Sequence, residues 1–148
     1  MRNIPFNEIK EKVKEACINT NHILGEDVIR SFQQALEGEE SPLGKEILTQ
    51  LIENARIARE KRIPLCQDTG LAVFFVELGS EVRVDGGQLS EAINQGVREG
   101  YQEGFLRKSA CHPFSRKNTG DNTPAIIHYE LTSGDKLKIT FCAKGGGS

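Results

Sequence analysis

The hydrophobic pattern of this chain changes its period at Pro64, and that change constrains the fold more than any other feature. Before the proline, apolar side chains recur every three or four residues, which is typical of helices that bury one face. After it, short runs rich in valine and phenylalanine alternate with turn residues, which is typical of strands. The pattern therefore predicts a helical N-terminal third followed by a sheet.

Three helices are expected before Pro64. The first is predicted around residues 6–17 and the second around residues 28–36, with Gly38 placed to end it. Ser41 and Pro42 form a suitable N-cap and first-turn pair for the third helix. Because a proline disfavours helical geometry at the residue before it, we expect the third helix to end near Arg62.

Four strand candidates follow, at residues 71–78, 81–85, 125–132 and 136–143. The last two flank Ser133, Gly134 and Asp135, a sequence typical of a hairpin turn. A fourth helix is predicted from about Ser90 to Lys108. Because hairpin connections are too short for parallel crossovers, the prediction is an α+β fold with a mostly antiparallel sheet of about four strands packed with helices.

Three glycines, Gly96, Gly100 and Gly104, recur every fourth residue along the predicted fourth helix. Each glycine in a helix interior costs about 1 kcal/mol relative to alanine. Two interpretations follow from this spacing. Either another backbone approaches this face closely, or the helix is simply weak.

Length and charge exclude several classes of protein. A chain of 148 residues suits a single domain, 1–148, with a core large enough to be stable. A net charge of -2 argues against a general nucleic-acid binder. No apolar run reaches the roughly 20 residues of a membrane helix. The first residues lack the apolar stretch of a secretory signal, so we expect a cytoplasmic protein without a membrane partner.

The four cysteines, Cys17, Cys66, Cys111 and Cys142, are widely scattered. None belongs to a CxxC pair, so a zinc knuckle within this chain is not expected. A disulfide framework is not expected in a cytoplasmic chain of this size.

The segment 64–70 places a thiol, an amide and a carboxylate side by side between a helix and a strand, at Cys66, Gln67 and Asp68. A cysteine in this position can ligate a metal, and a carboxylate two residues later can act as a general acid or base. The alternative is a plain turn in which Asp68 or Thr69 bonds to the local backbone.

Two further segments are candidates for anion binding. Residues 116–124 combine two cations with glycine and hydroxyl residues, which is typical either of a nest for a carboxylate or phosphate or of an ordinary surface loop. Residues 144–148 form a glycine run whose amides can approach an anion closely. An engineered linker has the same composition.

Four segments taken in order carry a resemblance to a known family: Pro64–Gly70 (PLCQDTG), Leu106–Arg107, Lys117–Ala125 (KNTGDNTPA) and Ala143–Ser148 (AKGGGS). Together they resemble the iron–sulfur-dependent class I fumarate hydratases and their relatives, the L-tartrate dehydratases, specifically the α subunit or α domain. The resemblance extends from the first helix onward. It identifies the glycine run as family sequence rather than a linker.

The resemblance implies a hydro-lyase that hydrates fumarate to L-malate, or dehydrates tartrate, with a [4Fe-4S] cluster. Cys66 corresponds to a ligand of that cluster, and Asp68 to a candidate acid/base catalyst. Gln67, Arg107 and Gly147 match substrate-binding positions.

The chain departs from the family in one respect: only one of the three cluster cysteines is recognisable. The other two lie beyond the triple glycine in the family, and Cys17, Cys111 and Cys142 match no ligand position. We therefore expect the N-terminal portion of an α subunit, truncated after the KGGGS motif and inactive alone. The implied partners are a small dicarboxylate, the β subunit or β domain of the same enzyme, and further copies in an oligomer. The alternative is a non-catalytic module that docks to partner subunits.

Overall fold

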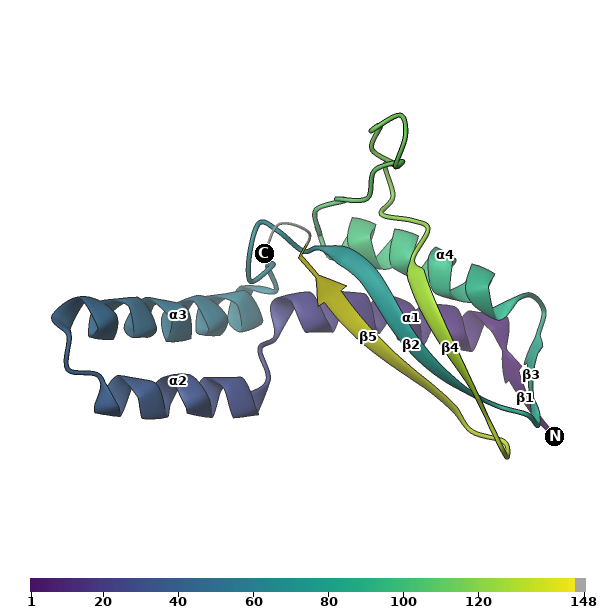
Figure 1. Ribbon diagram of the computed structural model, residues 1–148, viewed down its shortest axis with the longest axis horizontal. Helices are drawn as coiled ribbons and strands as arrows, with labels where there is room; N and C mark the ends of the chain where they lie inside the picture. The colour runs from purple at the N-terminus through teal and green to yellow at the C-terminus, as the bar shows by residue number, and fades with distance from the viewer. Residues whose placement is uncertain (146–148) are drawn as a thin grey trace.

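A computed structural model describes residues 1–145 of the chain. Its elements, in chain order, are β1 (Arg2–Pro5), α1 (Phe6–His22), α2 (Glu26–Gly38), α3 (Pro42–Lys61), β2 (Leu71–Gly79), β3 (Val82–Asp85), α4 (Leu89–Glu103), β4 (Ile126–Thr132) and β5 (Leu137–Lys144) (Figure 1). The predicted α+β class is confirmed. Within the described residues, five strands form two small sheets.

The helical third begins and ends close to the predicted positions. The Ser41 hydroxyl caps α3 by accepting a hydrogen bond from the Gly44 amide at 3.4 Å. This helix ends where Arg62 adopts a left-handed conformation with φ 51°. The fourth helix is shorter than predicted, because α4 ends at Glu103 and Phe105 has a positive φ of 54°.

The sheet is mixed, and here the expectation of a mostly antiparallel arrangement was wrong. In the three-stranded sheet, β2 lies in the centre, parallel to β4 and antiparallel to β5. The second sheet pairs β1 with β3, also in parallel. Helix α4 lies between β2 and β4 in the chain and provides the long crossover that a parallel pair needs.

The predicted hairpin between the last two strands is not formed, because β2 separates β4 from β5. Their connecting turn crosses the end of β2 at Gly79. The Gly79 amide donates to the Lys136 carbonyl at 2.9 Å, and a side chain at Gly79 would collide with the carbonyl of Gly134. A short turn therefore joins two strands that are neighbours in the chain but not in the sheet.

The core lies between the three-stranded sheet and the pair α1 and α4. Its largest fully buried side chains include Phe74 from β2 and Tyr101 and Ile93 from α4. A Cβ atom on Gly96 would lie 2.6 Å from the Lys10 carbonyl oxygen of α1, and one on Gly100 would lie 2.9 Å from Cβ of Cys17. The close-approach interpretation of the glycines is confirmed at these two positions, since the backbones of α1 and α4 need the space.

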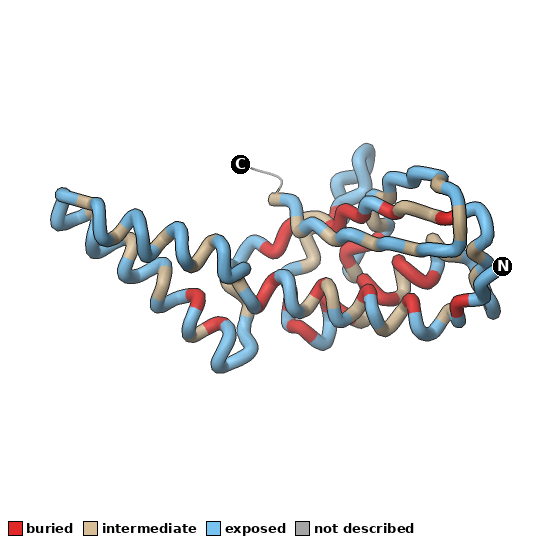
Figure 2. The backbone as a smooth tube through the Cα atoms, turned by 90° about the horizontal axis from the view of Figure 1, so that it is seen from below, coloured by how far each residue is buried: buried red, intermediate tan, exposed pale blue. Residues whose placement is uncertain are grey.

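Helices α2 and α3 form a hairpin that extends away from this core (Figures 1 and 2). Helix α2 has no buried residue, and α3 buries only Ala55 and Ala58. Leu43, Ile47 and Leu51 of α3 are exposed. In the part of the chain described, no helix combines the length and hydropathy that a membrane span requires.

Candidate active site

The loop between α3 and β2 presents three exposed side chains, Cys66, Gln67 and Asp68, at the N-terminal end of β2. The Oδ1 atom of Asp68 accepts a hydrogen bond from the Gly70 amide at 3.0 Å, so this oxygen holds the turn. Among the described residues, Oδ2 has no hydrogen-bond partner. The Cys66 Sγ atom accepts a long bond from the Asp68 amide at 3.5 Å. The Oδ1 atom therefore stabilises the turn, while the Oδ2 atom makes no hydrogen bond to the described residues.

Thr69 connects this loop to Arg107. Its side chain is buried, and its hydroxyl donates to the Arg107 carbonyl oxygen at 2.9 Å. The Arg107 side chain is exposed, and none of the ion pairs between described residues includes it. The first two motifs are thus adjacent through the backbone, with the guanidinium available to an anion.

Asn122, from the third motif, contacts both of these segments. Its Oδ1 atom accepts from the amides of Ser109 and Ala110, at 2.7 and 2.9 Å. Its Nδ2 group donates to the Gly70 carbonyl oxygen at 3.2 Å. The third motif therefore joins residues 64–70, called the cysteine loop below, to the segment that follows Arg107.

The start of the fourth motif lies against Gly70. Lys144 pairs with Leu71 in the sheet, and a Cβ atom on Gly70 would lie 2.6 Å from the Lys144 carbonyl carbon and oxygen. Gly70 also has a positive φ of 69°, which favours glycine. Gly147, the predicted substrate-binding glycine, lies outside the described residues.

Tyr101 of α4 supports the same loop, and no sequence motif predicted it as a site residue. Its hydroxyl donates to the Thr69 carbonyl oxygen at 3.1 Å, and burial raises the pKa of this phenol. The available signal was its position between Gly100 and Gly104, on the helix face that the glycines mark as closely packed.

Three backbone amides of the candidate nest in the third motif already have partners within the protein. The Thr119 amide donates to the Ala110 carbonyl, the Gly120 amide to the Asn118 side chain, and the Thr123 amide to the Asp121 side chain. Burial alone would raise the pKa of Asp121, but hydrogen bonds from Thr123 and Arg98 outweigh it and lower that pKa. These hydrogen bonds hold the segment against itself and against Ala110.

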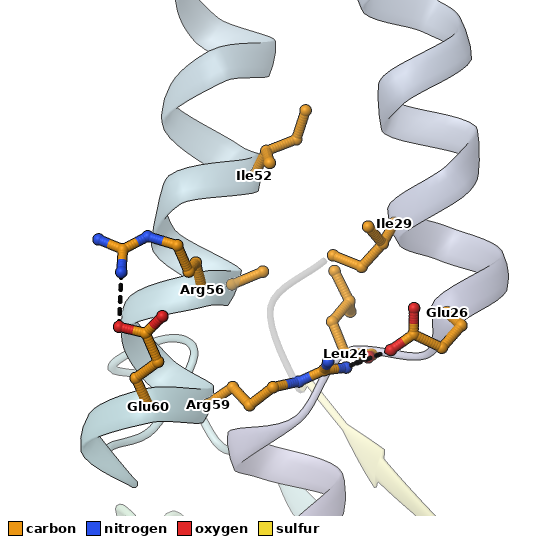
Figure 3. A pocket seen from close by; sticks show the side chains of 8 residues that line it. Leu24, Glu26, Ile29, Ile52, Arg56, Arg59 and Glu60 are labelled. Carbon is orange, nitrogen blue, oxygen red and sulfur yellow. Dashed lines mark hydrogen bonds and ion pairs between the residues drawn. The ribbon is translucent and has the colours of Figure 1, made fainter.

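A pocket of about 300 Å³ lies between α2 and α3, away from the four motifs (Figure 3). Ile29, Ile52 and Leu24 contribute its apolar lining. Its two arginines are already paired, Arg56 with Glu53 and Glu60, and Arg59 with Glu26. Because ion pairs within α3 and between α3 and α2 already neutralise these charges, the pocket does not suit an anionic substrate.

No group of three cysteine, histidine or carboxylate side chains suited to a metal ion occurs within residues 1–145. Cys66 is an exposed thiol on a loop and fits the chemistry of one thiolate ligand. The described residues therefore include one candidate ligand, Cys66, and do not form a complete cluster site.

Comparison with known proteins gives the same family as the four motifs. A profile of the family described as Fumarate hydratase (Fumerase) matches residues 10–148. The chain is 34% identical over 146 residues to the putative L(+)-tartrate dehydratase subunit alpha of Methanocaldococcus jannaschii, covering 95% of this chain and 50% of that protein. It is 38% identical over 113 residues to the anaerobic class I fumarate hydratase of Escherichia coli K12, covering 74% and 20%. Fumarate hydratase 2 of Leishmania major is 34% identical over 137 residues, covering 90% and 24%.

The fold and its site define an α+β structure in which the first three motifs and the start of the fourth lie together at one end of a three-stranded sheet. The chain belongs to the fumarate hydratase (Fumerase) family. The resemblance drawn from the motifs is thereby confirmed. The chain spans about half the length of the tartrate dehydratase α subunit it matches.

Proposed function

We propose that this chain is the N-terminal portion of the α subunit of an iron–sulfur hydro-lyase acting on a four-carbon dicarboxylate, either fumarate and L-malate or tartrate. The observation that carries the proposal is that Thr69 and Asn122 bond the segment of Cys66 and Asp68 to the segment of Arg107. Similarity to proteins named tartrate dehydratase subunit alpha supports a partner β subunit. Further copies in an oligomer belong to the same proposal.

The exposed side chains have separate roles in this proposal. The Arg107 guanidinium binds one substrate carboxylate through two parallel hydrogen bonds, and the Gln67 amide orients the substrate beside it. The open Oδ2 atom of Asp68 takes the proton from the carbon next to a carboxylate. The electron pair of that C–H bond forms the double bond, and the hydroxyl on the neighbouring carbon leaves with its bonding pair as hydroxide. The hydroxide takes a proton from solvent to become water, and Asp68 later returns its proton to solvent.

Cys66 is proposed as one ligand of a [4Fe-4S] cluster, with the remaining ligands outside the described residues. When bound, an iron of such a cluster supplies a Lewis acid for the substrate's oxygen atoms. The exposure of Cys66 next to Asp68 supports this assignment. The chain's own contribution is to hold this thiol beside the carboxylate and guanidinium.

The test uses the complete enzyme that contains this segment, purified without oxygen. We expect Cys66→Ser to lose the cluster absorbance and the turnover of malate and tartrate, because an alkoxide or hydroxyl holds such iron far less well than a thiolate. Cys111→Ser and Cys142→Ser replace exposed thiols and serve as matched controls that keep both signals. The 148-residue chain alone, treated with iron and sulfide, should show no turnover.

Two outcomes would contradict the proposal. Equal cluster loss in all three serine variants would remove the ligand role from Cys66. A wild-type enzyme that carries the cluster but turns over neither dicarboxylate would favour the alternative, a binding or assembly module.

A further inference from the structure

Asn122 is a buried polar residue that connects the loops around the candidate site by hydrogen bonds. Only 1% of its surface is exposed, and its amide makes three hydrogen bonds to backbone groups. Its backbone has a positive φ of 63°, a conformation that asparagine tolerates better than most residues. A residue with this burial and conformation has few acceptable replacements.

The orientation of the Asn122 amide follows from its partners. Two backbone N–H groups, of Ser109 and Ala110, point at one side of it, and only an oxygen can accept both. The NH₂ group therefore faces the Gly70 carbonyl. The side chain thus acts as an acceptor toward one loop and a donor toward the other.

Those two loops carry the groups that must act together. Gly70 ends the segment that presents Cys66 and Asp68, and Ser109 follows Arg107 by two residues. The Thr69 hydroxyl makes a second link, to the Arg107 carbonyl oxygen. The functional side chains of both loops are exposed, and these buried bonds join one loop to the other.

We propose that Asn122 is a positioning residue that holds the cysteine loop (residues 64–70) and the arginine loop (residues 107–111) at a fixed distance and orientation. The inference rests on the proposed function, because the relative position of the two loops matters only if Cys66, Asp68 and Arg107 act on one substrate. Misplacement of such groups by about 1 Å is enough to weaken binding and catalysis strongly. Asn122 itself need not touch the substrate.

The substitution that isolates this role is Asn122→Asp. A carboxylate keeps the positive φ accessible and can still accept from the amides of Ser109 and Ala110. When ionised, it cannot donate to Gly70, and it places a negative charge against that carbonyl oxygen. The variant therefore keeps one half of the link and removes the other.

Asn94→Asp is the matched control. Asn94 is partly buried, where Asn122 is fully buried, and it likewise accepts from a backbone amide, of Ala125, and donates to a carbonyl, of Ser90. It joins α4 to the start of β4, away from the cysteine loop. The same chemical change is therefore made at a link that does not join the two functional loops.

The experiment compares these variants in the complete, cluster-loaded enzyme with malate and tartrate. We expect Asn122→Asp to raise KM about tenfold or more at unchanged iron content, with KM of Asn94→Asp within about twofold of wild type. Partial unfolding would lower apparent kcat and leave KM unchanged, so the KM change separates positioning from a structural role. If Asn122→Asp fails to fold, Thr69→Val removes the second link at nearly constant shape and should raise KM in the same direction.

Hydrogen exchange on the same enzyme without substrate gives a readout independent of activity. In Asn122→Asp, peptides covering residues 66–71 should exchange faster, while peptides covering 107–111 change less because their acceptor remains. Unchanged KM in both Asn122→Asp and Thr69→Val, or equal loosening of the two loops, would overturn the inference. A wild-type enzyme without turnover would count against the proposed function, and the exchange pattern would still decide the role of Asn122.

Discussion

The carboxylate of Asp68 uses one oxygen in the fold, since Oδ1 accepts the Gly70 amide at 3.0 Å. The substitution Asp68→Asn keeps that acceptor and removes only the proton-accepting oxygen. We therefore expect kcat to fall by roughly 10²–10⁴ with little change in KM in the complete enzyme.

Arg107→Ala should instead raise KM strongly and also lower kcat, because the guanidinium binds both the ground state and the developing charge. Steady-state kinetics with malate distinguishes the two variants. A near-normal kcat in Asp68→Asn would show that Asp68 only stabilises the turn and takes no part in proton transfer.

Cys17 is the fully buried thiol of the chain, and burial raises its pKa to about 12. After unfolding, the thiol meets water and titrates near its ordinary value of 9.0. Above that pH the unfolded chain releases a proton that the folded chain keeps, so the free energy of unfolding falls as the pH rises from about 9 toward 12. Burial raises the pKa of Tyr101 as well, which acts in the same direction.

Urea unfolding of the chain at about pH 8 and about pH 10 measures this loss of stability. Cys17→Ala should be less stable at both values, because it leaves a small cavity, but its stability should depend less on pH. An identical pH dependence in the variant and the wild type would exclude Cys17 as the cause.

At the scale of elements, the contact between α1 and α4 depends on the absence of a side chain at Gly96. A Cβ atom there would lie 2.6 Å from the Lys10 carbonyl oxygen, which is backbone and cannot move aside freely. We expect Gly96→Ala to destabilise the chain by about 1–3 kcal/mol, the usual cost of overpacking a core.

Gly38→Ala provides the control for that prediction. A Cβ atom at Gly38, the last residue of α2, would meet no atom within 4 Å. Alanine there should be neutral or stabilising by up to about 1 kcal/mol, because it improves helix propensity. Urea midpoints for both variants provide the measurement, and equal destabilisation would show that the glycines serve something other than close approach.

At the scale of the whole molecule, the α2–α3 hairpin and the core should differ in local stability. Helix α2 has no buried residue, whereas α4 contributes buried residues along its whole length, from Ala92 to Tyr101 (Figure 2). Local opening costs less where few apolar contacts are lost. In the 148-residue chain, amides of residues 26–38 should therefore exchange with solvent faster than those of residues 89–103. Equal protection of the two helices by hydrogen-exchange mass spectrometry would show that they open together.

Much of the local structure could be predicted from the sequence, since local signals specify it. Apolar spacing, the Ser41 cap and Pro64 located the first three helices, and the glycine spacing of α4 indicated its close neighbour. The order of four motifs was enough to identify the family. The candidate roles of Cys66, Asp68 and Arg107 came from that resemblance and stay predictions.

Strand pairing was decided only in the tertiary structure. The short turn between β4 and β5 favours a hairpin locally, but β2 lies between the two strands and makes hydrogen bonds with both. A buried strand with two apolar partners outweighs a turn preference, because pairing and burial act along the whole strand while the turn acts at one point.

The sequence by itself determined the helices, the α+β class and the family. Periodicity, capping and motif order are properties of neighbours in the chain, and each can be identified without knowing what packs against it. The tertiary structure alone decided the strand order and the assembly of the site. Asn122 lies 52 residues from Gly70 in the chain, and its side chain has a partner there only because α4 brings β4 beside β2. Contacts of that kind depend on packing between distant elements, which local sequence signals do not specify.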